Sequence, residues 1–186
     1  MMIENTRITV FGGSKPKKGE FAYQDALILG TLLGQAGFTV ITGGYIGTME
    51  AVSRGASQAG GHVIGITCDE IESWRPVVPN PWIKEELRFP TLKNRLYALI
   101  NNCDAALALP GGIGTLQEII VMWAQLQIGA GIPKPLILIG EGWEFVVGAF
   151  YKGLGEYIPD KDRQWVQFVP NPKMAMEALQ FHFSLT

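Results

Sequence analysis

Short apolar runs alternate along this chain with longer segments of helical periodicity. The runs expected to form strands are Arg7–Phe11, Phe38–Ile41, His62–Thr67, Ala105–Leu109, Leu136–Ile139 and Trp165–Val169. The helical patterns between and after them cover Tyr23–Gln35, Thr48–Ala59, Leu92–Asn102, Thr115–Gln127, Trp143–Tyr151 and Pro172–Phe181. Such alternation is typical of parallel strands joined by crossover helices. The predicted fold is therefore α/β, a Rossmann-like doubly wound parallel sheet with helices on both faces.

The length and composition favour one domain with a large core. Of the 186 residues, 47% are hydrophobic and only 17% are charged, which suits a sheet buried on both faces. We expect a single Rossmann-like domain over residues 1–186. The segment Cys68–Pro90 has neither pattern and is expected to be irregular, wrapping over a sheet edge or a binding site.

The charge pattern argues against several functional classes. A net charge of −2 and no basic stripe give no field for nucleic acid, and no apolar run reaches membrane-spanning length. The start of the chain shows no signal-peptide pattern, and Cys68 and Cys103 are isolated, so we expect reduced thiols and a cytoplasmic protein. His62 and His182 are too far apart to suggest a metal site.

Two glycine-rich turns each lie between an expected strand and an expected helix. They read TGGYIGTME, residues 42–50, and LPGGIGTLQE, residues 109–118. Glycine lets a ligand approach the backbone closely, and the free N–H groups and dipole of the following helix attract an anion. Turns at the carboxyl ends of strands in one sheet can flank one crevice. The spacing matches neither GxGxxG nor GxxxxGKS/T, so neither a dinucleotide nor a Walker-type nucleotide is indicated.

Each of these features also has a purely structural interpretation. Glycine-rich turns can simply make tight connections, and Thr115 with Glu118 has the spacing of a helix capping box. Arg95 can be a solvated cation on its helix. Its spacing from Leu92 and Leu99 nevertheless puts it at the border of the core face, from which it can reach inward.

Residues 110–118, PGGIGTLQE, fit the PGGxGTxxE signature of the LONELY GUY (LOG) family, whose members were long described as lysine decarboxylases. Arg95 lies at the same distance upstream as that family's arginine, and Gly43–Met49 resembles its earlier glycine motif. The resemblance extends from Ile8 to Ile139. It implies a Rossmann-like homodimer or larger assembly.

The resemblance also implies an activity, the hydrolysis of nucleoside 5'-monophosphates, including cytokinin precursors, to the base and ribose 5-phosphate. Arg95 and Glu118 would be the catalytic pair, and no cofactor or metal would be required. The candidate phosphate- and ligand-binding residues are Gly43, Gly44, Tyr45, Gly47 and Thr48 in the first turn and Gly111, Gly112, Gly114 and Thr115 in the second.

The chain departs from the family pattern in ways that keep a second function open. The family's arginine is usually followed by lysine, but Leu96 follows Arg95 here, and Thr42 replaces a glycine before the first turn. Tyr45 and the Trp-containing segment 68–90 can stack on a larger heterocycle. Molybdenum cofactor carrier proteins resemble this family and bind a phosphorylated pterin without converting it. Carriage of molybdenum cofactor is therefore the alternative, and a scaffold without a ligand is a third.

Other residues carry simpler expectations. The helix over Thr115–Gln127 has one apolar face with Leu116, Ile119, Ile120 and Trp123 and a second with Val121, Met122 and Leu126. Since a sheet contact needs only one face, we predict a subunit interface on the second.

Two further predictions concern polar and charged residues. Glu50 and Arg54, four residues apart on a helix, are expected to form a surface ion pair. Ser14, Lys15 and Lys17 can touch a phosphate or serve only as loop residues.

Overall fold

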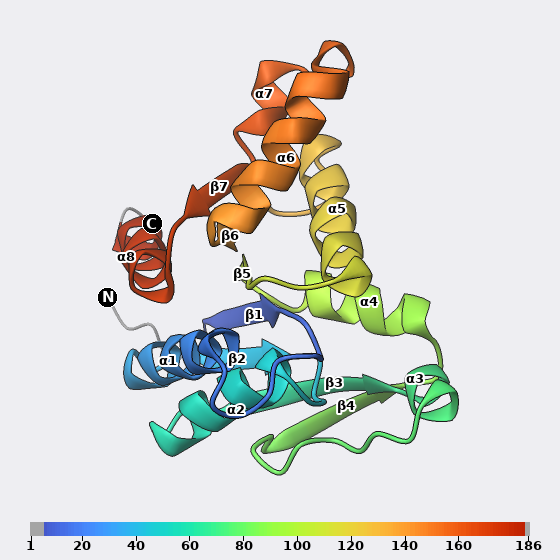
Figure 1. Cartoon of the computed structure of the whole chain (residues 1–186), viewed down its shortest axis with the longest axis vertical. Coiled ribbons are helices and arrows are strands. Elements are labelled where there is room, and N and C mark those ends of the chain that lie inside the picture. Colours follow the sequence, from blue (N-terminus) through green and yellow to red (C-terminus); the bar gives the residue numbers. More distant parts are fainter. Residues whose placement is uncertain (1–5, 185–186) are drawn as a thin grey trace.

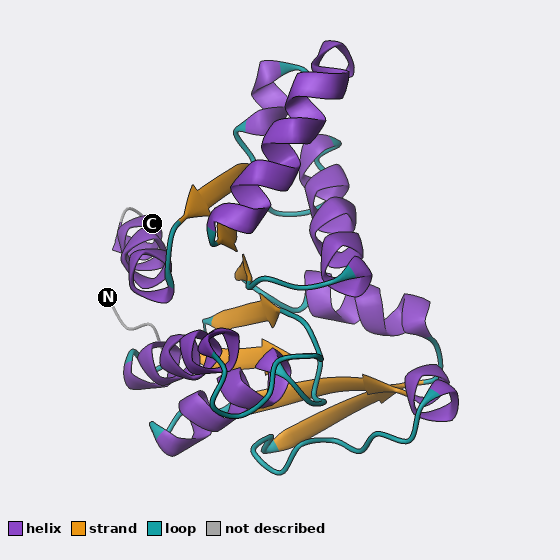
Figure 2. Ribbon diagram, viewed as in Figure 1, coloured by secondary structure: helices purple, strands orange, loops and turns teal. Residues whose placement is uncertain are grey.

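The computed structural model describes residues 6–184 and contains a seven-stranded parallel sheet (Figures 1 and 2). The strands are β1 (Arg7–Phe11), β2 (Thr39–Thr42), β3 (Val63–Cys68), β4 (Glu85–Phe89), β5 (Ala105–Ala108), β6 (Leu136–Ile139) and β7 (Val166–Val169). The helices are α1 (Phe21–Gln35), α2 (Thr48–Gln58), α3 (Asp69–Trp74), α4 (Leu92–Asn101), α5 (Ile113–Gln127), α6 (Glu141–Leu154), η1 (Gly155–Tyr157), α7 (Asp160–Arg163) and α8 (Pro172–Ser184). The α/β class predicted from the sequence is confirmed.

The strands lie in the order β4-β3-β2-β1-β5-β6-β7, and every neighbouring pair is parallel. The chain runs outward from β1 to β4 and then returns to place β5 on the other side of β1. The strand order therefore reverses between β1 and β5, which is where ligands of such sheets bind, outside the carboxyl ends of the strands.

Helices cover both faces of the sheet (Figure 1). Alternate residues such as Ile8 and Val10 of β1 pack with α1, α2 and α8, whereas Phe11 packs on the other face with α4, α5 and α6. Burial on both sides explains why the strands are continuous apolar runs in the sequence. Glycines bring α1 and α2 together, since a Cβ at Gly30 would overlap the carbonyl oxygen of Val52.

The prediction that residues 68–90 are irregular is wrong in part. This segment holds α3 and the edge strand β4, which pairs with β3 alone. The sequence of β4, EELRF, is rich in charge because the strand lies at the edge and is largely exposed. The helix α3 has only six residues and no apolar periodicity that a sequence pattern can detect.

The prediction for the two faces of α5 is also wrong. Met122 and Leu126 are buried against the sheet beside Ile119 and Trp123, because these four residues lie on one side of the helix. The partly exposed apolar residues are instead Leu116 and Ile120. An uncovered apolar face exists on α5, but on the side that was assigned to the sheet.

No helix within residues 6–184 is both long and apolar enough to cross a bilayer.

Candidate functional site

The turns after β1, β2 and β5 meet at the carboxyl edge of the sheet. The carbonyl oxygen of Gly13, in the turn after β1, accepts hydrogen bonds from the backbone N (2.9 Å) and Oγ1 (3.1 Å) of Thr48. A Cβ at Gly13 would lie 3.3 Å from the Cα of Gly111. Gly47 has a φ of 77°, and a Cβ there would lie 2.6 Å from the Cα of Ser14. The three turns are therefore held against one another by the backbone.

A cleft of about 540 Å³ opens above these turns. Its lining comes from the turn after β1, from α3 and the residue that follows it, from Arg95 of α4, and from the start of α5 with Glu118. The cleft therefore lies at the reversal of strand order, the position that the sheet topology predicts for a ligand site.

Arg95 and Glu118 meet at the bottom of this cleft. Arg95 is only 6% exposed, and its side chain donates from Nε to the carbonyl oxygen of Ile66 (2.8 Å) and from Nη2 to that of Gly43 (3.0 Å). The remaining nitrogen, Nη1, lies 3.8 Å from Oε1 of Glu118. The interpretation of Arg95 as a solvated surface cation is therefore wrong, because the carbonyls after β2 and in β3 hold its guanidinium inside the cleft.

Glu118 is 9% exposed, and this burial raises the pKa of its carboxyl to about 7, although the nearby Arg95 guanidinium acts in the opposite direction. Removal of a carboxylate from water disfavours its charged form. Near neutral pH the carboxyl can consequently be protonated or ionised at little cost, which suits a group that exchanges protons.

The second glycine turn leads into α5 and leaves the backbone N–H groups of the helix start without a capping side chain. The helix starts at Ile113 with Gly112 as N-cap, and no side chain caps its first turn. Thr115 and Glu118 thus lie inside the helix, so the capping-box interpretation of this pair is wrong. Because Gly111, Gly112 and Gly114 are exposed at the cleft, the unpaired N–H groups of the helix start face it without a covering side chain.

The first glycine turn lies mostly behind the cleft, where it supports other residues. Gly43 leaves room for Arg95, since a Cβ there would overlap Nη2 of Arg95 and lie 2.6 Å from Sδ of Met49. Gly44 has a φ of 78°, and its carbonyl oxygen accepts from Asn80. Gly43, Gly44, Gly47 and Thr48 stay predictions as ligand contacts, and their observed contacts are with the protein.

Tyr45 does line the cleft but is only 1% exposed. Its hydroxyl accepts from the backbone N of Cys68 (2.8 Å) and lies 3.2 Å from Oε1 of Glu72, and burial raises its pKa to about 12. The ring centroid lies 5.7 Å from the guanidinium carbon of Arg95. This contact lets Tyr45 position Arg95 through a cation–π interaction.

Part of the cleft lining was not predicted from the sequence. Ile71 and Trp74 of α3 and the following Arg75 line the cleft, together with Ser14 and Lys15. The segment 68–90, which contains Trp74, was expected to wrap over a sheet edge or a binding site, and Ser14 and Lys15 were named as possible phosphate contacts. Arg75 carried no signal, because its place depends on the unrecognised helix α3.

The predicted ion pair of Glu50 with Arg54 is not formed. Glu50 pairs with Lys18 (3.0 Å) and not with Arg54, whose guanidinium lies 5.5 Å from the ring centroid of Trp82. Leu96 of α4 is buried in the core and is not among the residues that line the cleft.

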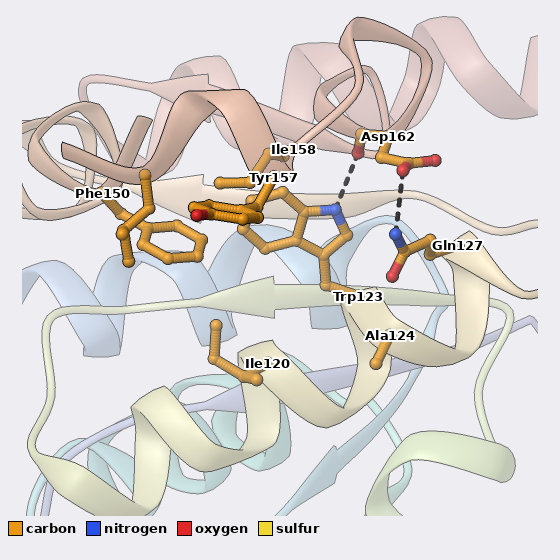
Figure 3. A pocket seen from close by; sticks show the side chains of 9 residues that line it. Ile120, Trp123, Ala124, Gln127, Phe150, Tyr157, Ile158 and Asp162 are labelled. Atoms are coloured by element: carbon orange, nitrogen blue, oxygen red, sulfur yellow. Dashed lines mark hydrogen bonds between the residues drawn. The ribbon is translucent and has the colours of Figure 1, made fainter. Parts of the chain in front are cut away.

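A separate hollow of about 330 Å³ lies between α5, α6 and the segment η1–α7 (Figure 3). Its polar groups satisfy one another: Trp123 donates to the carbonyl oxygen of Asp162 (2.7 Å), and Gln127 donates to the Asp162 carboxylate (2.8 Å). The rest of the lining is mainly apolar. This hollow therefore has an apolar character, unlike the glycine-rich cleft.

Fold and cleft together define the class of this protein. It is a Rossmann-like α/β protein with a glycine-rich cleft and a buried Arg–Glu pair at the reversal of strand order. The model of the family described as "Possible lysine decarboxylase" matches residues 49–179. The chain belongs to this family, the LOG family.

Relatives in this family include plant enzymes. A probable cytokinin riboside 5'-monophosphate phosphoribohydrolase of Oryza sativa subsp. japonica is 38% identical over 135 residues, covering 66% of this chain but only 50% of the relative. A second such rice protein is 30% identical over 179 residues, covering 94% of this chain and 77% of the relative. A cytokinin riboside 5'-monophosphate phosphoribohydrolase of Arabidopsis thaliana is 30% identical over 182 residues, with the same coverages.

Solved structures share the fold. The molybdenum cofactor binding protein of Rippkaea orientalis superposes with a TM-score of 0.76 at 22% identity, covering 97% of this chain and 99% of that one. The molybdenum cofactor carrier protein of Chlamydomonas reinhardtii gives a TM-score of 0.72 at 19% identity, with the same coverages.

Proposed function

We propose that this protein is a phosphoribohydrolase, which hydrolyses the N-glycosidic bond of nucleoside 5'-monophosphates and releases the base and ribose 5-phosphate. The observation that carries the proposal is the buried Arg95–Glu118 pair, 3.8 Å apart, in the same cleft as the uncapped start of α5. The names of the plant relatives support the reaction and suggest cytokinin riboside 5'-monophosphates as one substrate class.

The proposed mechanism uses the carboxylate form of Glu118. Breaking an N-glycosidic bond develops positive charge on the sugar, which a nearby carboxylate stabilises while it also orients the attacking water. Arg95 favours the ionised form of Glu118, because an adjacent positive charge opposes the effect of burial. The phosphate would bind the N–H groups at Gly111–Thr115. The reaction requires no cofactor.

Release of free base tests the proposal. The purified protein is incubated with a panel of nucleoside monophosphates, including AMP and isopentenyladenosine monophosphate, and the base is followed by chromatography. Glu118→Gln should abolish release while sparing much of the binding. Gly112→Val should abolish both, because a branched side chain would stand in the turn that receives the phosphate. Full turnover by Glu118→Gln would show that the mechanism is wrong.

Carriage of molybdenum cofactor is the second candidate. The named ligand of the structural neighbours favours it, and so does Leu96, which supplies no cation beside Arg95. The cofactor's terminal phosphate would use the same start of α5. Tight binding of the cofactor by a protein that releases no base from any nucleotide would establish this function in place of hydrolysis.

We also propose that the protein is a homodimer or higher homo-oligomer joined through α5 and α6. Val146, Phe150 and Leu154 form a stripe on α6 that is at least 40% exposed, beside the partly exposed Ile120 of α5. The apolar hollow of Figure 3 lies on the same face. Projecting rings and a hollow on one face are what a self-complementary two-fold interface requires.

The oligomer proposal is tested by light scattering coupled to size-exclusion chromatography. Phe150→Glu should reduce the wild-type mass to that of a monomer. The control is Phe181→Glu, which changes a phenylalanine that is 66% exposed on α8 and should leave the mass unchanged. A monomeric wild type would contradict the proposal. A cytoplasmic location stays a prediction, supported by the two buried free thiols, Cys68 and Cys103.

A further inference from the structure

Four charged side chains line the glycine-rich cleft, and two of them are already engaged. Arg95 donates to two backbone carbonyls and faces Glu118, so this pair brings little free charge. The other two are Lys15 and Arg75. Among residues 6–184 neither forms an ion pair with a carboxylate. The cleft thus holds two cations whose charge the protein does not neutralise.

Arg75 is held in place but keeps most of its donors free. Its Nη1 donates to Oγ of Ser14 (3.2 Å), and its guanidinium carbon lies 5.5 Å from the ring centroid of Trp74. Its Nε is buried and has no hydrogen-bond partner within the described part of the chain. A guanidinium carries five N–H donors in a planar fork that matches a phosphate. A buried donor without a partner is costly, and an anionic ligand would remove that cost.

The contact with Ser14 places Arg75 beside the proposed phosphate turn. Ser14 follows Gly13, and a Cβ at Gly13 would lie 3.3 Å from the Cα of Gly111. Arg75 and Lys15 therefore line the same cleft as the start of α5, and Arg75 is joined to it through Ser14. An anion at the N–H groups of Gly111–Thr115 would share the cleft with these two cations.

We infer that Arg75, assisted by Lys15, is the side-chain clamp for the phosphate of the ligand and restricts the cleft to phosphate esters. The inference rests on the proposed binding of a phosphorylated ligand. It adds the two side chains that would recognise the negative charge of the phosphate. Hydrogen bonds to a charged group are strong, so loss of the Arg75 guanidinium should weaken phosphate binding by roughly tenfold to a hundredfold.

The test compares two arginines with similar surroundings. Arg54 also lies 5.5 Å from a tryptophan ring, that of Trp82, and also has a buried Nε without a partner among the described residues, but it does not line the cleft. Binding of ribose 5-phosphate and of inorganic phosphate is measured by calorimetry for the wild type, Arg75→Gln and Arg54→Gln. Only Arg75→Gln should raise Kd tenfold or more. A smaller rise is expected for Lys15→Gln, and none for Lys17→Gln.

A second readout separates recognition from folding. Arg75 would contact the phosphate and would not contact the N-glycosidic bond that breaks. Arg75→Gln should therefore raise KM for AMP and leave kcat within about threefold of the wild type. Arg75→Lys should recover part of the affinity, since it restores the charge but not the planar fork. A damaged fold would instead reduce the active fraction and lower kcat.

The outcomes distinguish this inference from the proposed function. If Arg75→Gln binds ribose 5-phosphate as tightly as the wild type, the inference is wrong, whether or not base is released. If binding depends on Arg75 but no nucleotide releases base, hydrolysis is wrong and the inference stands. If the wild type binds neither probe, both fail.

Discussion

Glu118→Gln should change how the stability of the fold depends on pH. Burial raises the pKa of this carboxyl from 4.5 to about 7. Below pH 4.5 the group is protonated in the folded and the unfolded chain alike. Between pH 4.5 and 7 the folded chain keeps a proton that the unfolded chain releases, so stability falls as pH rises and the loss is complete above the folded pKa. Glutamine has no proton to release.

The expected size follows from the shift. Each pKa unit corresponds to about 1.4 kcal/mol, so the total is roughly 3 kcal/mol, of which roughly 2 to 3 kcal/mol falls between pH 5 and pH 8. In a chain of this length 1 kcal/mol moves Tm by about 2 to 4 °C. The Tm of Glu118→Gln, relative to that of the wild type, should therefore rise by roughly 5 to 10 °C between pH 5 and pH 8.

Thermal unfolding followed by circular dichroism at pH 5, 6, 7 and 8 measures this difference. Glu141→Gln is the control, because Glu141 is exposed at the start of α6, and its Tm should follow that of the wild type at every pH. A constant Tm difference between Glu118→Gln and the wild type over this range would refute the argument that burial raises the pKa of Glu118.

Three further results are expected. The kcat/KM for base release should rise with pH and level off above about 7, because the proposed mechanism needs the ionised carboxyl of Glu118; a profile that is flat from pH 5 to pH 8 would argue for another base. Gly43→Ala should reduce base release at least tenfold and also lower Tm, because the new Cβ displaces the buried guanidinium of Arg95 from the carbonyls to which it donates. Gly148→Ala, at a helix position with open space around it, is the control, and equal activities of the two variants would contradict this role for Gly43. Gly30→Ala should lower the free energy of unfolding by about 1 to 3 kcal/mol, since its Cβ meets the backbone of α2; an unchanged urea midpoint would show that the helices move apart freely.

The buried parts of the fold could be predicted from the sequence because buried strands and helix faces appear in it as runs or periodic repeats of apolar residues. Strands such as Ala105–Ala108 are covered on both faces, so all of their residues are apolar. The edge strand Glu85–Phe89 was not predicted because it is largely exposed. Its sequence therefore contains charged residues and lacks the apolar run that marks a central strand. On α5 the apolar residues were divided wrongly between two faces, because Met122 and Leu126 pack on the sheet together with Ile119 and Trp123.

The residues of the candidate site likewise include some that the sequence predicts and some that it does not. Arg95 and Glu118 could be named because the sequence around them resembles the motifs of the LOG family, and the structure brings them together. Arg75 could not, because it enters the cleft at the end of a six-residue helix whose position depends on tertiary contacts. The Glu50–Arg54 pair failed because local spacing competed with two tertiary partners, Lys18 and Trp82.

The interlocked turns at the ends of β1, β2 and β5 have a consequence for how ligands are accommodated. Backbone contacts such as those from Thr48 to Gly13 hold the floor of the cleft before any ligand arrives, so little conformational entropy is lost there on binding. Another wall comes from α3 and Arg75, which contact that floor through side chains, Glu72 with Tyr45 and Arg75 with Ser14. Substitutions of Ile71 and Trp74 in this wall can alter which group attached to the phosphate is accepted, while Arg75 keeps its place beside the phosphate. A single scaffold can in this way acquire new ligands by changing one short segment.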